Sequence, residues 1–305
     1  MRARAIVNLR AGTAARRALA ALERRGAAWK DLEVVLTERP AHARELARDA
    51  AERGFECVLS VGGDGTANEA AWGLLGTETA LGVLPSGSGN GLARTLRLSL
   101  DPSRALATLA QSVVKLMDVG YVNQRPFLNV AGTGFDAAVG LAFQERARNG
   151  ARRGVLGYIR AGLTQVFSYR TTPLAFEGAT EPLPTDALLV TFANGPQFGG
   201  AAVIAPGARL NDGLLDVVLI EDEPRLKLLL QAPRLFVGGL SSLAAYRRVA
   251  VTSLIVEAAT PLLHHCDGEP EPPVARLAVR LAPRALRVLV PPWTADDPTG
   301  PFLPD

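Results

Sequence analysis

The sequence predicts two kinds of fold in one chain: an α/β region with a parallel sheet, then a region made mainly of antiparallel β-strands. In residues 1–118, short apolar runs alternate with segments of helical periodicity. That alternation is typical of repeated β-α units. In residues 119–283 the segments become shorter and mostly β-like, separated by Gly, Pro and Asn. We therefore expect two domains.

Four strands of the first region are expected to end at one edge of its sheet. The candidate strands are 5–7, 32–36, 57–61, 80–84 and 114–119, with helices between them. Because the carboxyl ends of parallel strands meet at one edge, the loops after the first four strands should lie together. Ligands of open α/β folds bind at that edge.

Two of these loops are glycine-rich turns. Residues 62–66 read Gly-Gly-Asp-Gly-Thr after an apolar strand, and Thr66 can cap the helix that follows. Residues 85–91 read Pro-Ser-Gly-Ser-Gly-Asn-Gly after the next strand. Glycines let backbone N–H groups approach phosphate oxygens closely. A single turn of this kind is equally well explained as a plain strand-to-helix connection, but two at successive strand ends predict a phosphate site.

Composition sets the class of protein. The chain has 305 residues, is 48% hydrophobic and carries a net charge of +3, which is too small to indicate nucleic acid binding. Arginines crowd the first 25 residues, either as a solvated helix face or as a membrane-facing patch. The two cysteines, Cys57 and Cys266, form no metal or disulfide pattern and fit a reducing cytoplasm. No apolar run has the length to span a membrane, so membrane contact should be peripheral.

The pair of glycine turns, at this separation, resembles the diacylglycerol kinase catalytic-domain family, which contains soluble bacterial lipid kinases and the sphingosine kinases. Matches at 192–200, 205–217 and 267–269 extend the resemblance over nearly the whole chain. It implies a nucleotide-binding domain like that of NAD kinases at 1–118, completed by a strand at 284–291. It also implies an antiparallel β-sandwich, the lipid-substrate domain, at 119–283. The four prolines and three aspartates of 292–305 predict a disordered tail.

In the first domain, the resemblance implies binding of ATP with Mg²⁺. The positions that match the family's nucleotide contacts are Asn8, Gly12, Thr37, Gly62, Gly63, Asp64, Gly65, Thr66, Asn68, Glu69, Gly87, Ser88 and Asn90. The family's first loop usually reads Asn-Pro-x-Ser/Ala-Gly. Here residues 8–12 read Asn-Leu-Arg-Ala-Gly, so the proline is missing and the loop should be less rigid.

In the second domain, the resemblance implies roles for two loops. Asp136 follows a glycine turn and should face the lipid acceptor, although a simple helix-start residue explains it equally well. Asp212, with backbone oxygens of Arg209 and Leu214, should bind a structural magnesium ion, since hard oxygen ligands suit that metal. A hairpin turn closed by 211–213 is the alternative without a metal.

The turn Asp-Gly-Glu at 267–269 matches the family's catalytic turn, which reaches into the cleft between the domains and supplies the base. We expect Glu269 to be the base, with Asp267 orienting it, and Asp64 is the rival base. A polar hairpin tip is the plain alternative. The preceding His264, His265 and Cys266 do not predict zinc, because adjacent residues point in different directions and no second ligand pair exists.

The predicted function is that of an ATP-dependent lipid kinase acting at a membrane surface. Basic and apolar residues mix in 146–169 and 225–247, which suits either a membrane interface or a core-facing amphipathic helix. A diacylglycerol-like glycerolipid is the first candidate substrate and a sphingoid base or ceramide the second; a homodimer stays open. Two other classes also stay open: a kinase of small soluble molecules, since NAD kinases and phosphofructokinases share Gly-Gly-Asp-Gly, and a non-catalytic nucleotide- or lipid-binding protein.

Overall fold

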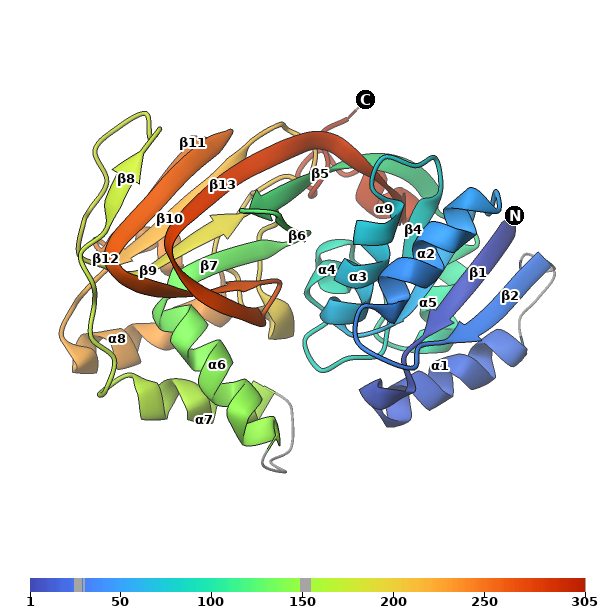
Figure 1. Cartoon of the computed structure of the whole chain (residues 1–305), viewed down its shortest axis with the longest axis horizontal. Helices are drawn as coiled ribbons and strands as arrows, with labels where there is room; N and C mark the ends of the chain where they lie inside the picture. The colour runs from blue at the N-terminus through green and yellow to red at the C-terminus, as the bar shows by residue number, and fades with distance from the viewer. Residues whose placement is uncertain (25–28, 30, 149–154, 305) are drawn as a thin grey trace. The chain divides into compact units, whose positions relative to one another are not determined.

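The chain divides into two compact units (Figure 1). The computed structural model describes residues 1–24, 29, 31–148 and 155–304. The first unit comprises Met1–Val119, Arg209–Asp212 and Pro283–Asp305. The second comprises Gly120–Ala208 and Gly213–Ala282. Two long strands, β5 (Val113–Val122) and β13 (Glu269–Val290), each contribute residues to both units.

The first unit is an α/β structure. Its other strands are β1 (Arg2–Val7), β2 (Asp31–Leu36), β3 (Cys57–Gly62) and β4 (Ala80–Pro85). Its helices are η1 (Leu9–Ala11), α1 (Thr13–Glu23), α2 (His42–Glu52), α3 (Asp64–Leu74), α4 (Gly91–Thr95), α5 (Pro102–Leu109) and α9 (Pro292–Ala295).

The sheet of the first unit is parallel, as predicted. Its strands lie in the order β13-β4-β3-β1-β2. Val7 pairs with Leu36 on one side and with Val61 on the other, and Gly62 pairs with Pro85, so the four carboxyl ends are level. Helices α2 and α3 pack together, as do α1 and α5 (Figure 1). Strands β3 and β4 are buried along their whole lengths, as expected for parallel strands covered by helices.

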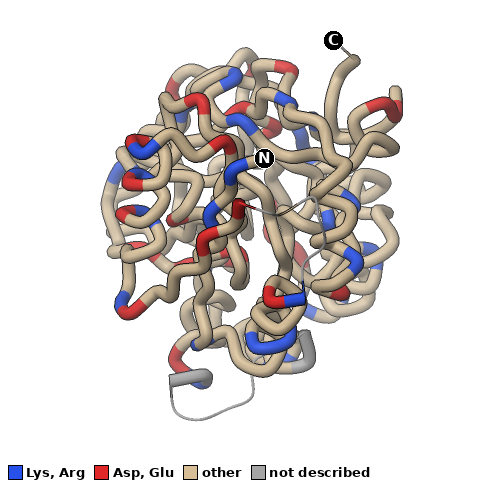
Figure 2. Tube along the Cα trace, turned by 90° about the vertical axis from the view of Figure 1, so that its right-hand side faces the viewer, with Lys and Arg blue, Asp and Glu red and all other residues tan. Residues whose placement is uncertain are grey.

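Charges on the first unit are mixed rather than gathered in a basic face (Figure 2). Arg4 is buried on β1, where its guanidinium lies 2.9 Å from Glu33 and also bonds Asp49. Arg17 pairs with Asp101 across 3.5 Å. Arg17 is largely exposed on α1, which favours the solvated-face interpretation for that helix, whereas Arg4 belongs to neither interpretation because it is buried. Arg25 lies outside the described residues.

The second unit is mainly β. Its other strands are β6 (Arg125–Phe127), β7 (Val130–Gly134), β8 (Ala175–Glu177), β9 (Ala187–Ala193), β10 (Leu215–Glu221), β11 (Tyr246–Val251) and β12 (Ser253–Cys266). Its helices are α6 (Phe135–Arg148), α7 (Val155–Gln165), η3 (Gly199–Ala201), α8 (Arg225–Gln231), η4 (Ala232–Phe236) and η5 (Leu240–Ser242).

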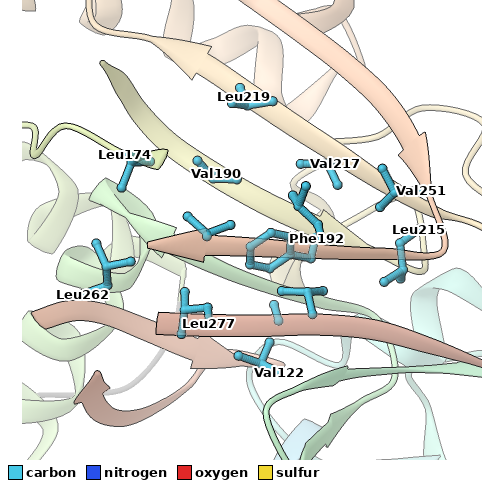
Figure 3. Close-up of a cluster of buried hydrophobic side chains, with 14 of the residues drawn as sticks. Val122, Leu174, Val190, Phe192, Leu215, Val217, Leu219, Val251, Leu262 and Leu277 are labelled. Atoms are coloured by element: carbon cyan, nitrogen blue, oxygen red, sulfur yellow. The ribbon is translucent and has the colours of Figure 1, made fainter. Parts of the chain in front are cut away.

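Antiparallel pairing in the order β11-β10-β9-β7-β12-β13 forms the sheet of this unit, as predicted. Successive side chains of a strand point to opposite faces. Accordingly, Val217 and Leu219 of β10 join one apolar core, which also contains Phe192 of β9 (Figure 3). Val218 and Ile220 join a second core on the other face. Both faces of the sheet are therefore covered.

Three segments differ from the sequence expectations. Thr66 lies inside α3, whose N-cap is Gly63, so it does not cap the helix. The helical segment expected at 146–169 belongs to two helices, α6 and α7, and Arg152 and Arg153 lie outside the described residues. The C-terminal segment does not have the disorder that its composition predicts. It forms α9, buries Phe302 completely and ties Thr294 to the Leu96 carbonyl at 3.0 Å.

Candidate functional site

The two glycine turns of the first unit touch through their backbones. A Cβ added to Gly87 would lie 2.4 Å from Cα of Gly63, and one added to Gly63 would lie 3.3 Å from Cα of Gly87. The Ser86 N–H donates to the Gly62 carbonyl at 2.7 Å and links the turns. Two backbones can approach this closely only because neither residue has a side chain. The glycines thus place two sets of backbone N–H groups at one edge of the sheet.

Side chains of the turns brace this arrangement. Asn90 has a left-handed conformation (φ 51°), accepts from the Gly87 N–H at 2.9 Å and donates to the Gly87 carbonyl at 2.8 Å. The Asp64 carboxylate, at the first position of α3, accepts from the Leu92 N–H at 3.4 Å. Asp64 therefore joins the start of α3 to the start of α4. Its carboxylate stands where the two turns meet.

The loop after β1 lies beside the first glycine turn. Asn8 donates from Nδ2 to the Thr66 hydroxyl at 3.1 Å, and its backbone N–H donates to the Val61 carbonyl at 2.9 Å. Gly12, at the end of this loop, has φ +89° and open space around its Cβ position. The Thr37 N–H donates to the Val7 carbonyl at 3.0 Å, which holds the loop after β2 to the same edge.

The remaining nucleotide candidates have different surroundings. Asn68 is buried within α3 and Ser88 is exposed at the tip of the second turn, while Gly65 is partly exposed. The Glu69 carboxylate accepts from the Ala41 N–H at 2.9 Å and the Ala43 N–H at 3.3 Å. Glu69 thus accepts hydrogen bonds from backbone N–H groups at the start of α2. This structural role cannot be inferred from its position after the glycine turn.

The loop at 209–214 precedes β10. Asn211 exchanges two hydrogen bonds with the Leu303 backbone, at 2.6 and 3.3 Å, and Arg209 donates to the Pro298 carbonyl at 2.9 Å. Asp212 is partly exposed, and Gly213 turns the chain with φ +77° before the exposed Leu214. Among the described residues, no group of three or more His, Cys, Asp or Glu side chains could hold a metal ion. A cation here would depend on one carboxylate and backbone oxygens, a ligand set that suits Mg²⁺.

In the second unit, the turn at 267–269 is a tight hairpin between β12 and β13. Cys266 pairs with Glu269, so Asp267 (φ 49°) and Gly268 (φ 82°) form the two-residue loop. Positive φ at both positions is the geometry that Asp-Gly favours. The Asp267 carboxylate accepts three backbone N–H bonds, from Leu128 at 2.7 Å, Asn129 at 2.8 Å and Val130 at 3.2 Å.

Asp267 and Glu269 therefore differ in what their carboxylates can do. The bonds to Asp267 fix the turn to the start of β7 and the two residues before it, and they engage both carboxylate oxygens. Glu269 is exposed, and its Oε2 accepts from Gln144 of α6 at 3.4 Å. A general base must be reachable by the proton it removes. Of these two carboxylates, Glu269 meets that requirement better.

Asp136, at the second position of α6, is 7% exposed and lies in a buried polar cluster. Its Oδ2 lies 3.2 Å from Nε2 of His265 and accepts from the Thr191 hydroxyl at 3.4 Å. Burial and then the Asp136 charge raise the pKa of Tyr169, to about 12. The Tyr169 phenol therefore stays neutral at neutral pH.

His265 was not singled out as a functional residue in the sequence. In the sequence, the run 264–266 raises only the question of zinc, which its spacing does not predict. No local sequence signal marks His265, because its place opposite Gly132 on β7, beside the turn that precedes Asp136, depends on the pairing register of distant strands.

Comparison with known proteins identifies the family. The model of the diacylglycerol kinase catalytic domain matches residues 2–122, and that of the YegS C-terminal NAD kinase beta sandwich-like domain matches residues 129–290. The chain belongs to the diacylglycerol kinase family. This confirms the family, the two-part fold and the prediction of a kinase.

Relatives and solved structures agree over most of the chain. A "Probable lipid kinase YegS-like" of Pseudomonas aeruginosa is 34% identical over 277 residues, covering 87% of this chain and 86% of the relative. A "Diacylglycerol kinase" of Mycobacterium tuberculosis is 31% identical over 288 residues, covering 91% and 90%.

Two solved structures share the fold. A diacylglycerol kinase of Bacillus anthracis superposes with a TM-score of 0.72 at 21% identity, covering 95% of this chain and 97% of its own. An NAD kinase of Archaeoglobus fulgidus in complex with ATP superposes with a TM-score of 0.54 at 15% identity, covering 95% of this chain and 94% of its own.

The described residues contain no helix whose length and apolar character would let it span a membrane.

Proposed function

We propose that this kinase transfers the γ-phosphoryl group of ATP to a hydroxyl group of a membrane lipid. The bond between the γ-phosphorus and the bridging oxygen breaks, a bond from phosphorus to the lipid oxygen forms, and ADP leaves. The lipid hydroxyl gives its proton to Glu269. A diacylglycerol-like glycerolipid is the first candidate acceptor, as in the named relatives, and a sphingoid base or ceramide is the second.

The observation that carries the proposal is the backbone contact between Gly63 and Gly87. It presents N–H groups of two successive turns at one sheet edge, which suits a chain of phosphates. Phosphoryl transfer needs phosphates held in place, neutralised charge and a placed acceptor more than it needs covalent chemistry from the protein. The ATP-bound NAD kinase with this fold supports ATP as the nucleotide.

Magnesium would neutralise phosphate charge in this reaction. Asp64 stands where the two turns meet and offers a carboxylate beside the proposed phosphate site. Asp212, with the backbone oxygens of Arg209 and Leu214, would hold a second, structural ion. Both sites rely on single carboxylates, which matches the way Mg²⁺ keeps waters or phosphate oxygens as its other ligands.

The base and its turn are assigned within the second unit. Glu269 takes the proton, and Asp267 holds the turn through its three backbone bonds. Asp136 is proposed to face the lipid acceptor. Asp64 is the alternative base, because it also offers a carboxylate oxygen close to where the reacting phosphate would lie.

Exposed apolar side chains support work at a membrane surface. Leu226 and Leu230 on one face of α8 are 70% and 74% exposed, and Val237 is 80% exposed. Phe167, just after α7, is 63% exposed, and the start of α8 is linked to that segment by Arg225, which donates to the Tyr169 carbonyl at 3.3 Å. Exposed apolar side chains grouped on one helix face are typical of contact with a partner or a membrane. We call Leu226 and Leu230 the α8 apolar surface.

The test is transfer of label from γ-labelled ATP to defined lipids and to a total lipid extract, in detergent micelles and in vesicles. Label should enter the lipid phase only when the acceptor has a free hydroxyl. Label appearing only in a water-soluble product such as NADP would overturn the proposal, and nucleotide binding without turnover on any lipid would indicate a non-catalytic protein.

A further inference from the structure

A buried imidazole connects two functional candidates of the second unit. His265 on β12 is 3% exposed. Its Nε2 lies 3.2 Å from Oδ2 of Asp136, and its Nδ1 accepts from the Gly268 N–H at 3.2 Å. Gly268 is the residue directly before Glu269. One ring therefore bonds to the residue proposed to face the lipid and to the turn that carries the proposed base.

The two bonds define the protonation state of the ring. A backbone N–H can only donate, so Nδ1 must offer its lone pair to Gly268. The ring proton then lies on Nε2, where it is donated to the Asp136 carboxylate. A doubly protonated ring would set two donors against each other at Nδ1. Only the neutral Nε2–H tautomer satisfies both neighbours.

The fold makes room for this pair. Gly132 of β7 stands opposite His265, and a Cβ there would lie 2.4 Å from Oδ2 of Asp136 and 3.2 Å from Nε2 of His265. The Thr191 hydroxyl of β9 donates to the same Asp136 oxygen at 3.4 Å. Strands β7, β9 and β12 and helix α6 thus converge on one carboxylate.

The base turn has two sets of anchors. The Asp267 carboxylate accepts three backbone N–H bonds from residues 128–130 at the start of β7, and the His265 ring on β12 accepts the Gly268 N–H. Without the second anchor, the backbone before Glu269 would lose a fixed point while Asp267 stayed in place.

We infer that His265 is a positioning residue, which sets the Asp136 carboxylate and the Glu269 turn relative to each other through one neutral imidazole. The inference rests on the proposed function, because Asp136 and Glu269 hold their roles only there. It goes beyond that function by assigning one residue to both acceptor binding and base placement.

Two substitutions separate the two bonds. In His265→Asn the amide oxygen occupies the place of Nδ1 and can accept from Gly268, but the side chain is too short to reach Asp136. In His265→Gln the amide nitrogen reaches the place of Nε2 and can donate to Asp136, but the bond to Gly268 is lost. We expect His265→Asn to raise the KM for lipid about tenfold with kcat nearly unchanged, and His265→Gln to lower kcat about tenfold with KM nearly unchanged.

Controls separate positioning from a structural role. His264→Asn changes the adjacent buried histidine of the same strand and should leave kcat and KM at wild-type values. Gly132→Ala should raise the KM for lipid as His265→Asn does, although His265 is intact. ATP affinity should be unchanged in all four variants, because the nucleotide candidates belong to the first unit. Melting temperatures show that each variant is folded.

The outcomes are distinct. Suppose that the wild type phosphorylates lipid and both His265 variants are folded. If both variants keep wild-type kcat and KM, or if kcat falls and KM rises by the same factor in each, the inference is wrong. If the wild type phosphorylates no lipid, the proposed function is wrong, and the inference about His265 is then tested by a measurement that needs no turnover. Nitrogen-15 spectra of the imidazole, assigned with His265→Asn, should show the Nε2–H tautomer. An Nδ1–H or doubly protonated ring at neutral pH would overturn the inference.

Discussion

Alanine at Gly87 should separate the two glycine turns and weaken ATP binding. The added Cβ would lie 2.4 Å from Cα of Gly63, 3.2 Å from Oδ1 of Asn90 and 3.3 Å from the Gly63 nitrogen. Carbon atoms in contact lie about 3.5–4.0 Å apart, so the turns must move roughly 1 Å or more. Hydrogen bonds to phosphate do not survive such a displacement, because their heavy-atom distances span only about 0.5 Å.

The size of the effect follows from the bonds lost. A hydrogen bond to a charged group contributes roughly 1.5–3 kcal/mol. Loss of two therefore weakens ATP binding about 100-fold or more, since each 1.4 kcal/mol is about tenfold in affinity. At Gly63 the added Cβ would lie 3.3 Å from Gly87 Cα, so Gly63→Ala should cost less, about tenfold.

Isothermal calorimetry with ATP and Mg²⁺ measures the affinities. Gly162→Ala is the matched control, because its Cβ meets nothing within 4 Å on α7, and it should bind ATP like the wild type. Melting temperatures report that each variant is folded. Wild-type ATP affinity in folded Gly87→Ala would refute the reasoning, and so would an equal loss in Gly162→Ala.

Three further predictions concern the base, the metal loop and the membrane. Glu269→Gln keeps the size of the side chain but removes its basicity. It should lower kcat about 100-fold in steady-state kinetics and leave the ATP affinity measured by calorimetry unchanged. If Glu269→Gln keeps near wild-type turnover while Asp64→Asn is inactive, Asp64 is the base. We expect Mg²⁺ to raise the melting temperature of the nucleotide-free wild type. Asp212→Ala should lower activity and abolish that rise, and an unaltered rise would contradict a structural ion. The double substitution Leu226→Ser and Leu230→Ser should weaken binding to anionic vesicles about tenfold in sedimentation assays. A fully buried leucine contributes roughly 1.5–3 kcal/mol, and these two side chains would enter the membrane only partly. Unchanged binding would show that the α8 apolar surface does not contact the membrane.

The two glycine turns and the hairpin at 267–269 could be predicted from the sequence, because each depends on residues that are neighbours in the chain. The strand that ends at Gly62 and the one that ends at Pro85 are continuous apolar runs, and the glycines that follow each of them are visible in the sequence. Their contact followed from the rule that parallel strands end at one edge. The hairpin at 267–269 was likewise readable, because Asp-Gly favours two positive φ angles.

Long-range contacts could not be predicted in this way. The C-terminal segment is rich in proline and aspartate, yet Phe302 is buried and Thr294 bonds the Leu96 carbonyl, a residue 198 positions away. The Asp136–His265 bond spans 129 positions and depends on the space left by Gly132. Composition reports neither kind of contact, because each needs the register of strands that are distant in the chain.

The periodicity of α8 was ambiguous for a related reason. Apolar residues at helical spacing fit a core and a membrane face equally, and only their exposure separates the two. Leu226 and Leu230 are largely exposed, which argues against a core-facing role for them and leaves the membrane face a proposal. The sequence gives no measure of what covers a helix, so this distinction required the structure.

Transfer of label from γ-labelled ATP to a defined lipid, measured for the wild type, Asp64→Asn and Glu269→Gln side by side, tests the central claim most directly. Wild-type enzyme should place label in the organic phase with diacylglycerol-containing micelles, and lose it when the acceptor hydroxyl is blocked. Both variants should fall about 100-fold or more. Label that stays in the aqueous phase with every hydroxyl-bearing lipid, or lipid labelling that both variants leave intact, would contradict the account.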